Sequence, residues 1–305
     1  GQHLRTIADC RLQIADGAPA ALNLQSAITN LQSLQMAFGY TSEELNVVLK
    51  PMASTAHEAT GSMGDDTPLP ALSQLELGRP LFQFFKQRFA EVTNPPIDSL
   101  REELVMSLSV AVGRRRNILE ETPEHAHLLQ LSSPILTDAQ LAALRAHGDP
   151  LITVATVPAL VAPGETLEAA VARLCAAASR AVQDGASVLV VSDRGVDATN
   201  APIPALLAVS AVHHHMIRTG LRTLCSLLAE SGEPREVHHL AALVGYGAEA
   251  VNPYLALASV RQLAVERDAV KQRAAERAGD ARATPDDPRA RTLADEAEHN
   301  LVHAL

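Results

Sequence analysis

The sequence contains no tryptophan, and Phe and Tyr bring the aromatic content to only 3% of the 305 residues. A hydrophobic core must therefore depend on Leu, Val, Ile and Ala. Hydrophobic residues nevertheless make up 47% of the chain, and charged residues make up only 20%. This balance allows a sizeable core to be buried and predicts a globular protein.

Long apolar runs are also missing, since no run approaches the roughly 20 residues that span a bilayer. The first residues, Gly1 to Leu4, lack the pattern of a signal peptide. The three cysteines, Cys10, Cys175 and Cys225, lack the paired spacing of a zinc or iron–sulfur site. Isolated thiols of this kind predict a reduced, cytoplasmic protein with no metal site of its own.

Basic residues are outnumbered by acidic ones, 25 against 35, which gives a formal net charge of −10. A surface of that sign repels phosphate backbones and anionic lipid. We therefore expect neither nucleic acid nor a membrane as a partner.

The chain divides into three parts of different character. Residues 1–148 read as helices broken by Pro- and Gly-rich loops. Capping boxes at Thr41 to Glu44 and at Thr137 to Gln140 predict two helix starts, and Pro51 predicts the end of the first helix. Residues 61–68 and 93–98 are too rich in glycine and proline for helix interiors.

Residues 149–256 alternate short apolar runs with helical patterns. Strands are predicted at 151–155, 187–192, 221–228 and, more weakly, 249–252, and helices at 165–183, 203–219 and 234–244. A repeat of roughly 30 residues is typical of βαβ units. The predicted fold class is therefore α/β, with βα repeats forming a parallel sheet or a degenerate partial barrel.

Residues 257–305 change composition, because Arg, Glu, Asp and Ala dominate as far as Arg282. The segment from Thr284 to Pro288 interrupts this pattern, and a short helix is predicted from Thr292 onward. We interpret these residues as a charged helical connector that leads into a further domain.

Polar residues follow the predicted strands at the ends where parallel sheets carry their functional sites. They are Asp193, Arg194, Glu230, Ser231 and Asn252. They could form the site of a stand-alone α/β enzyme or of a metabolite-binding module. Alternatively, they pair with one another and cap helices. The second interpretation is favoured, because these loops lack a diagnostic nucleophile, base or phosphate loop.

Other candidate motifs have simpler structural explanations. Neighbouring residues on a helix point about 100° apart, so the histidines at 213–215 cannot converge on one ion, and neither can those at 238–239. A metal site that takes one histidine from each group is an alternative, but ordinary packing and hydrogen bonding are favoured. Gly245 and Gly247 lack the third glycine of a dinucleotide fingerprint and predict a helix end followed by a turn. Asp65 and Asp66 supply too few ligands for a dedicated cation site.

Several motifs together resemble one known family. They occur in the family's order over about residues 35–256, at 38–44, 61–68, 92–98, 101–104, 119–124, 192–195, 211–215 and 245–248. The chain is similar in these segments to the central domain of the glutamate synthase large subunit. Each motif alone is modest, but eight in order are specific.

The resemblance implies a place between two catalytic domains. In that family an amidotransferase domain with a terminal cysteine nucleophile releases ammonia from glutamine, and a barrel with FMN and an iron–sulfur cluster forms glutamate. This chain begins with Gly1 and lacks the downstream cysteine cluster, so no catalytic, cofactor or metal residue is assigned to it. We expect an inactive, colourless fragment whose partners are those two domains. An NADPH- or ferredoxin-linked donor would serve the full enzyme.

The implied role is to hold the two active sites in register and to wall the path of ammonia, away from protonation in bulk solvent. Irregular loops of small side chains suit such a wall. The candidate residues are Ser62, Met63, Asp65, Asp66, Thr67, Asn94, Pro95, Asp98 and Arg101.

Overall fold

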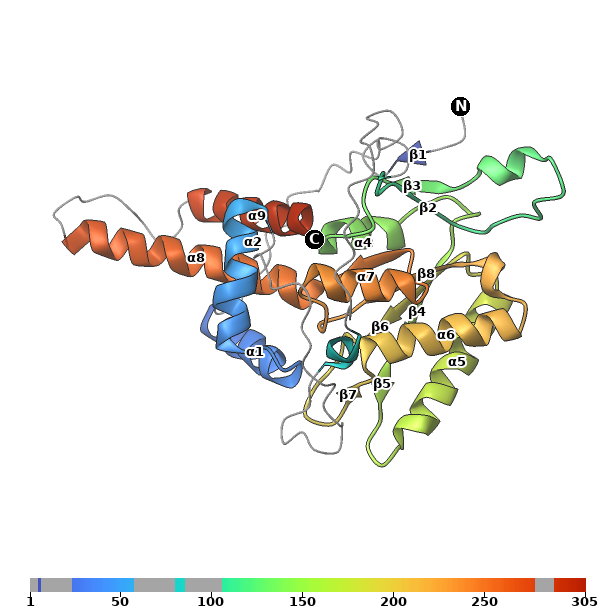
Figure 1. The fold of residues 1–305 in the computed structure, drawn as a ribbon, viewed down its shortest axis with the longest axis horizontal. Coiled ribbons are helices and arrows are strands. Elements are labelled where there is room, and N and C mark those ends of the chain that lie inside the picture. The colour runs from blue at the N-terminus through green and yellow to red at the C-terminus, as the bar shows by residue number, and fades with distance from the viewer. Residues whose placement is uncertain (1–4, 7–23, 58–79, 86–105, 278–287) are drawn as a thin grey trace, which may run out of the picture. The chain divides into compact units, whose positions relative to one another are not determined.

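The computed structural model describes residues 5–6, 24–57, 80–85, 106–277 and 288–305 (Figure 1). The chain forms two compact units, each built from separate segments. Unit 1 comprises Gly1–Gly17, Gly61–Ser231 and Ala241–Asn252, and unit 2 comprises Ala18–Thr60, Gly232–Leu240 and Pro253–Leu305.

Unit 1 is built on a four-stranded parallel sheet with the order β4-β6-β8-β9. The strands are β4 (Val154–Pro158), β6 (Val188–Ser192), β8 (Ser226–Glu230) and β9 (Ala250–Asn252). The predicted parallel pairing is confirmed. The first residues of two strands, β4 and β8, were predicted too early in the sequence. β4 begins at Val154, and β8 begins only after a 3₁₀ turn at Arg222–Leu224, where Arg222 donates to the carbonyl of Cys225.

Helices connect successive strands, as the βα repeat predicts. They are α5 (Leu167–Gln183), α6 (Ala205–Arg218) and α7 (Val237–Gly245). Thr166 caps α5 by accepting a hydrogen bond from the amide of Ala169. Gly185 follows α5 with φ +107°, so the predicted glycine stop is confirmed at a conformation that side chains with a Cβ rarely adopt.

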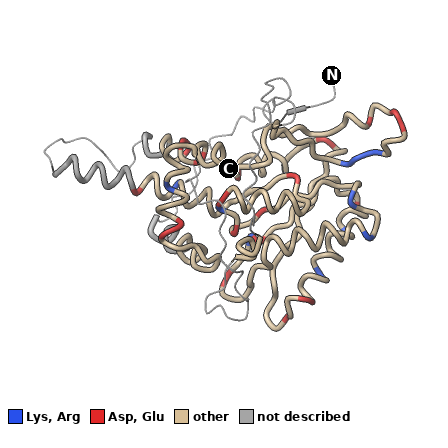
Figure 2. Tube along the Cα trace, in the orientation of Figure 1, with Lys and Arg blue, Asp and Glu red and all other residues tan. Residues whose placement is uncertain are grey.

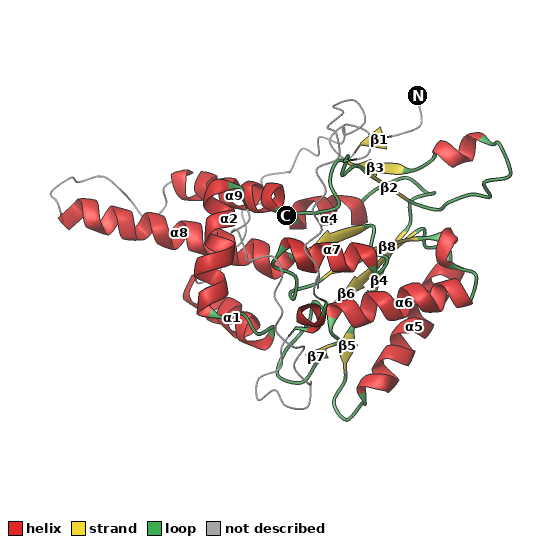
Figure 3. Ribbon diagram, in the orientation of Figure 1, coloured by secondary structure: helices red, strands yellow, loops and turns green. Residues whose placement is uncertain are grey.

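Both faces of this sheet are covered, which explains why its strands read as continuous apolar runs. α5 lies against β4 and β6, α5 and α6 lie side by side, and α6 lies against β8 (Figure 3). Side chains alternate along a strand, so Val188, Val190 and Leu228 belong to one buried cluster. That cluster also contains residues from a small second sheet and from α4 (Asp138–Arg145).

The small sheet is a difference from the predicted helical character of residues 1–148. It consists of β1 (Arg5–Thr6), β2 (Val110–Val112) and β3 (Leu129–Leu131), with β2 and β3 antiparallel. Three-residue strands are too short to show a period of two in the sequence. The capping box of Thr137 and Gln140 at the start of α4 is confirmed.

Shorter elements complete unit 1. They are η4 (Leu81–Phe84), η5 (Pro123–Ala126) and an antiparallel pair formed by β5 (Leu160–Val161) and β7 (Ala201–Pro202).

Unit 2 is helical. It contains α1 (Leu24–Ala37), the π-helical η2 (Glu44–Leu49), α2 (Lys50–Thr55), α8 (Tyr254–Arg277) and α9 (Pro288–Ala304). α8 packs against α9, and α9 also packs against α2. The capping box of Thr41 and Glu44 is confirmed by reciprocal bonds of 2.8 and 3.1 Å. The predicted stop at Pro51 is wrong, because η2 runs directly into α2 and the helix continues past Pro51 to Thr55.

The C-terminal helix predicted from Thr292 is confirmed within α9, which buries Ala294, Ala297 and Leu301. Within the part of the chain that the structure describes, no helix has the length and apolar character needed to cross a membrane. Cys175 and Cys225 are buried free thiols.

Candidate functional site

The predicted polar residues at the strand ends of unit 1 form one network centred on Glu230. Glu230 ends β8 and is only 1% exposed. Its Oε1 accepts from Arg194 Nε at 2.6 Å and from Arg145 Nη1 at 3.2 Å. Its Oε2 accepts from Arg145 Nη2 at 2.6 Å and from Ser192 Oγ at 2.6 Å. Two guanidinium groups and one hydroxyl therefore hold a single carboxylate.

The network reaches the remaining strands through shared partners. Arg145 Nη2 donates to Thr156 Oγ1 on β4 at 3.3 Å, and Arg194 Nη2 donates to Asp138 Oδ1 at 2.7 Å. Asn252, at the end of β9, donates to the same Asp138 oxygen at 3.0 Å. Hydrogen bonds thus tie the middle of β4 and the carboxyl ends of β6, β8 and β9 to α4.

Two further bonds reinforce this arrangement. Asn252 Nδ2 also donates to the carbonyl of Leu136 at 2.8 Å, and Ser231 Oγ donates to Asp193 Oδ2 at 2.5 Å. The sequence alternatives included pairing of Arg194 and capping of the following helix by Asn252. The pairing is confirmed, because Arg194 bonds Asp138 and Glu230. The capping prediction is wrong, because Asn252 Oδ1 accepts no hydrogen bond among the described residues and Nδ2 donates to Leu136 and Asp138 at the start of α4.

Charge pairing decides the protonation state of the central carboxyl. Burial by itself raises the pKa of Glu230, but hydrogen bonds from Arg145, Ser192 and Arg194 lower the pKa below its usual value. Burial lowers the pKa of Arg194, whereas Asp138 and Glu230 raise it, and the net direction is upward. Glu230 and Arg194 are therefore both ionised near neutral pH and form an ion pair with each other. A carboxylate held in this way is a poor general base.

One buried acceptor in this region has no donor among the described residues, namely Asn252 Oδ1. A single carbonyl oxygen beside a closed ion network offers too few contacts to orient a ligand. The strand ends therefore have the chemistry of a structural cluster.

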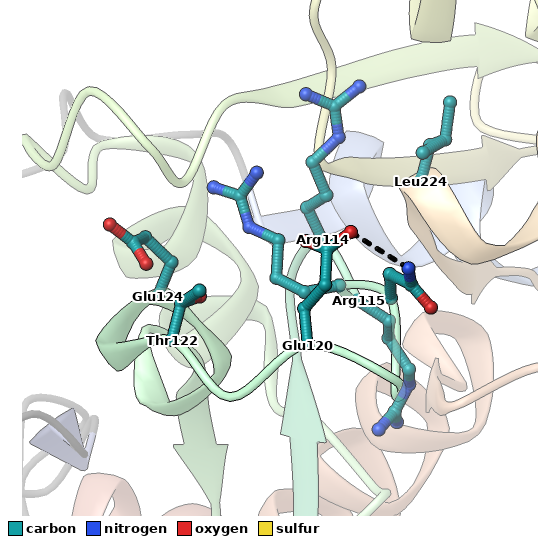
Figure 4. Close-up of a pocket in the computed structure, with 8 residues that line it drawn as sticks. Arg114, Arg115, Glu120, Thr122, Glu124 and Leu224 are labelled. Atoms are coloured by element: carbon teal, nitrogen blue, oxygen red, sulfur yellow. Dashed lines mark hydrogen bonds between the residues drawn. The ribbon is translucent and has the colours of Figure 1, made fainter.

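A second polar region, which sequence reasoning missed, lies on the connection from β2 to β3. An open cavity of about 580 Å3 is lined by Arg114, Arg115, Arg116, Asn117, Glu120, Thr122, Glu124 and Leu224 (Figure 4). The signal in the sequence was the run of three arginines directly after Gly113, followed closely by three glutamates.

Hydrogen bonds within this connection define its backbone. Asn117 Oδ1 accepts from the amide of Leu119 at 3.1 Å, and Asn117 Nδ2 donates to Glu120 Oε1 at 2.9 Å. His125 lies within hydrogen-bonding distance of two carbonyl oxygens, that of Asn117 at 2.8 Å and that of Thr122 at 3.0 Å. Those two carbonyls raise the pKa of His125.

The histidines at 213–215 do not converge, as helix geometry requires. His213 Nδ1 accepts from Arg222 Nε at 3.0 Å, whereas His215 Nε2 lies 2.8 Å from Ser179 Oγ. Across the described residues, no group of three or more His, Cys, Asp or Glu side chains could hold a metal ion. Gly247 has φ +111° and its carbonyl accepts from Arg222 Nη2, so the predicted turn before β9 is confirmed.

In unit 2 the most buried ionic group is Arg235, which is 1% exposed. It donates to Glu44 Oε1 through Nη2 at 2.8 Å and through Nε at 3.0 Å, and its guanidinium lies 4.4 Å from the centre of the Tyr40 ring. His239 is buried nearby, and burial, Arg235 and His238 lower its pKa to about 3. These groups stabilise the fold of unit 2 and form no open site.

The candidates for the ammonia path lie outside the described residues. This applies to Ser62, Met63, Asp65, Asp66, Thr67, Asn94, Pro95, Asp98 and Arg101. Their role stays a prediction from the sequence.

The fold and the network define an α/β domain whose strand ends are closed by internal ion pairs. Comparison with known proteins then identifies its family. The family model described as glutamate synthase central domain matches residues 33–286, so the chain belongs to that family.

Curated relatives agree with this assignment. The chain is 43% identical over 251 residues to the ferredoxin-dependent glutamate synthase of Pyropia yezoensis, a match that covers 82% of this chain and 16% of the relative. It is 45% identical over 256 residues to ferredoxin-dependent glutamate synthase 2 of a Synechocystis strain, covering 83% of this chain and 16% of the relative. Identity to the glutamate synthase [NADPH] large chain of Bacillus subtilis is 42% over 238 residues, covering 78% of this chain and 15% of the relative. The chain therefore spans about a sixth of the length of these relatives.

Proposed function

We propose that this chain is the non-catalytic central part of a glutamate synthase, an enzyme that makes glutamate from glutamine and 2-oxoglutarate. It would hold an amidotransferase domain and a synthase domain in register. The observation that supports this role most strongly is that the Glu230 carboxylate is fully occupied by ion pairs and hydrogen bonds. The acid at the strand ends, where an α/β enzyme places its reactive groups, is bound by two arginines and a serine.

The proposal extends to the cofactors, the electron donor and the cellular location of the larger enzyme. FMN and an iron–sulfur cluster would belong to the synthase domain downstream, and residues 257–305 would lead toward it. The electron donor would be NADPH or ferredoxin, since relatives with both kinds of name are similar to this chain. We place the whole enzyme in the cytoplasm, and we expect the 305-residue chain by itself to be inactive and colourless.

We further propose that residues 61–68 and 93–98 contribute wall to the ammonia path. Support comes from the sequence, because glycine and proline create irregular backbone that another domain can approach closely. Thr67 and Asn94 are the most useful positions to test, since each carries a small polar side chain within these segments.

Bulky substitution in the full-length enzyme tests the proposal. Thr67→Trp or Asn94→Trp should lower glutamate formation from glutamine and leave glutamate formation from a high concentration of ammonium unchanged, because external ammonia bypasses the path. Ala176→Trp, on an exposed position of α5, is the matched control and should change neither rate. Equal loss with both nitrogen sources, or no loss with either, would contradict the proposed path.

A further inference from the structure

The connection between β2 and η5 carries an unusual combination of exposed groups. Its residues 113–122, which we name the arginine loop, extend from the small sheet of unit 1 (Figure 1). Ile118 is 91% exposed and Leu119 is 87% exposed, the two highest values among the large hydrophobic side chains of the described residues. Adjacent large apolar groups in this position leave hydrophobic surface in water.

The same loop carries a concentrated positive charge in a chain of net charge −10. Arg114, Arg115 and Arg116 are consecutive and exposed, and Figure 2 shows a continuous blue stretch along this loop. In the described part of the chain, none of the three guanidinium groups forms an ion pair within 4.0 Å. Arg115 Nη2 makes only a 3.3 Å bond to the carbonyl of Ala111.

Internal bonds hold the loop in a defined shape. Asn117 and His125 fasten its tip, and the amide of Arg115 donates to the carbonyl of Thr223 at 3.0 Å. Because the backbone of the turn is already ordered, binding costs mainly the rotamer freedom of the exposed side chains. Preorganisation of this kind suits a contact surface.

The chemistry of the loop selects among classes of partner. Three nearby glutamates and the net charge of the chain disfavour a nucleic acid. A small anion is disfavoured because the guanidinium groups drawn in Figure 4 spread outward and do not converge on one point. An acidic protein surface with an apolar recess would accept both the arginines and the pair Ile118 and Leu119.

We propose that the arginine loop docks on an acidic surface of another domain in the same polypeptide. This inference rests on the proposed function, because it requires the longer chain. A loop of ten residues offers far less than the roughly 800 Å² per partner of a stable interface between separate proteins. Covalent linkage supplies an effective concentration on the order of millimolar, at which so small a contact becomes populated.

Photo-cross-linking in the full-length protein tests the docking contact without any measurement of turnover. Benzoylphenylalanine is introduced in place of Leu119 and, as a control, in place of Ile217, which is 51% exposed on α6. The cross-link from position 119 should join an acidic peptide outside residues 1–305 of the same molecule. Cross-links confined to residues 1–305, cross-links to a second copy, or a yield no higher than at position 217 would each overturn the proposal.

A second variant tests the role of charge. Replacing Arg114, Arg115 and Arg116 with Gln should lower the yield from position 119 by on the order of threefold or more, and 1 M salt should do the same to the unsubstituted loop. An unchanged cross-linking yield in both experiments would exclude an acidic surface as the partner of the arginine loop. The cross-linking experiment measures a covalent product and no enzymatic rate. Its result therefore does not depend on the outcome of the ammonia-path test.

Discussion

Replacing Glu230 with Gln tests how much the strand-end network stabilises unit 1. The substitution keeps the shape of the side chain and removes the charge that faces Arg145 and Arg194. Breaking a buried ion pair costs about 3–5 kcal/mol. The guanidinium groups are 35% and 43% exposed, so water compensates part of that loss. We therefore expect the free energy of unfolding to fall by about 2–3 kcal/mol at pH 7.

The pH dependence of this loss has a definite sign. The pKa of Glu230 is lowered in the folded state, so its contribution is fully present above the unfolded carboxyl pKa of about 4.3. The contribution disappears as the pH falls through the lower folded pKa. The stability difference between the wild type and Glu230→Gln should therefore shrink in acid.

The assay must report on unit 1 itself, and the chain has no Trp to serve as a fluorescent probe. Hydrogen exchange of the β6 and β8 amides during a urea titration follows the sheet directly. Glu165→Gln is the matched control, because Glu165 forms a similar two-point pair with Arg173 at the exposed start of α5. A loss at Glu230 no larger than at Glu165 would show that the buried network adds no more stability than an exposed pair.

Three further predictions concern single positions. Gly247→Ala should destabilise unit 1 strongly in urea titrations, because φ is +111° and the added Cβ would overlap the His213 ring; Gly245→Ala, with open space around it, is its control. Thr137→Ala should cost about 1 kcal/mol through loss of the α4 cap, measured in the same way. His239→Phe should make unit 2 more resistant to acid, because the lowered pKa of His239 reduces stability as the pH falls from about 6.5 toward about 3; an unchanged acid transition in a circular dichroism titration would contradict this.

The sequence predicted the parts of the fold that repeat. Apolar runs followed by helical patterns and a glycine located β6, α5 and α6 closely, because sheets buried on both faces leave continuous apolar strands. The starts of β4 and β8 were less accurate, since Ile152 and Cys225 are buried like strand residues although they precede the ladder. Local composition does not separate burial from strand pairing.

Most members of the strand-end network, including its central residue Glu230, were predicted from the sequence, but one partner was missed. The sequence placed Asp193, Arg194, Glu230, Ser231 and Asn252 at one edge of the sheet. It did not reveal Arg145, which reaches Glu230 from α4 across 85 positions of the sequence. A long-range partner of this kind depends on how α4 packs, which no local pattern encodes. The exposed pair Ile118 and Leu119 was missed for a related reason, because hydropathy does not show which side chains remain in solvent.

The non-catalytic role is tested by the activity of full-length Glu230→Gln, measured below its melting temperature. Glutamine hydrolysis and ammonium-dependent glutamate formation are assayed separately, so that each catalytic domain reports on its own. A structural role predicts that both rates stay within about twofold of the wild type, since the chemistry occurs in other domains. Removal of a general acid or base lowers the rate by about 10²–10⁴-fold. A loss of that size in either rate, with unit 1 shown to be folded by hydrogen exchange, would contradict the non-catalytic role proposed for this chain.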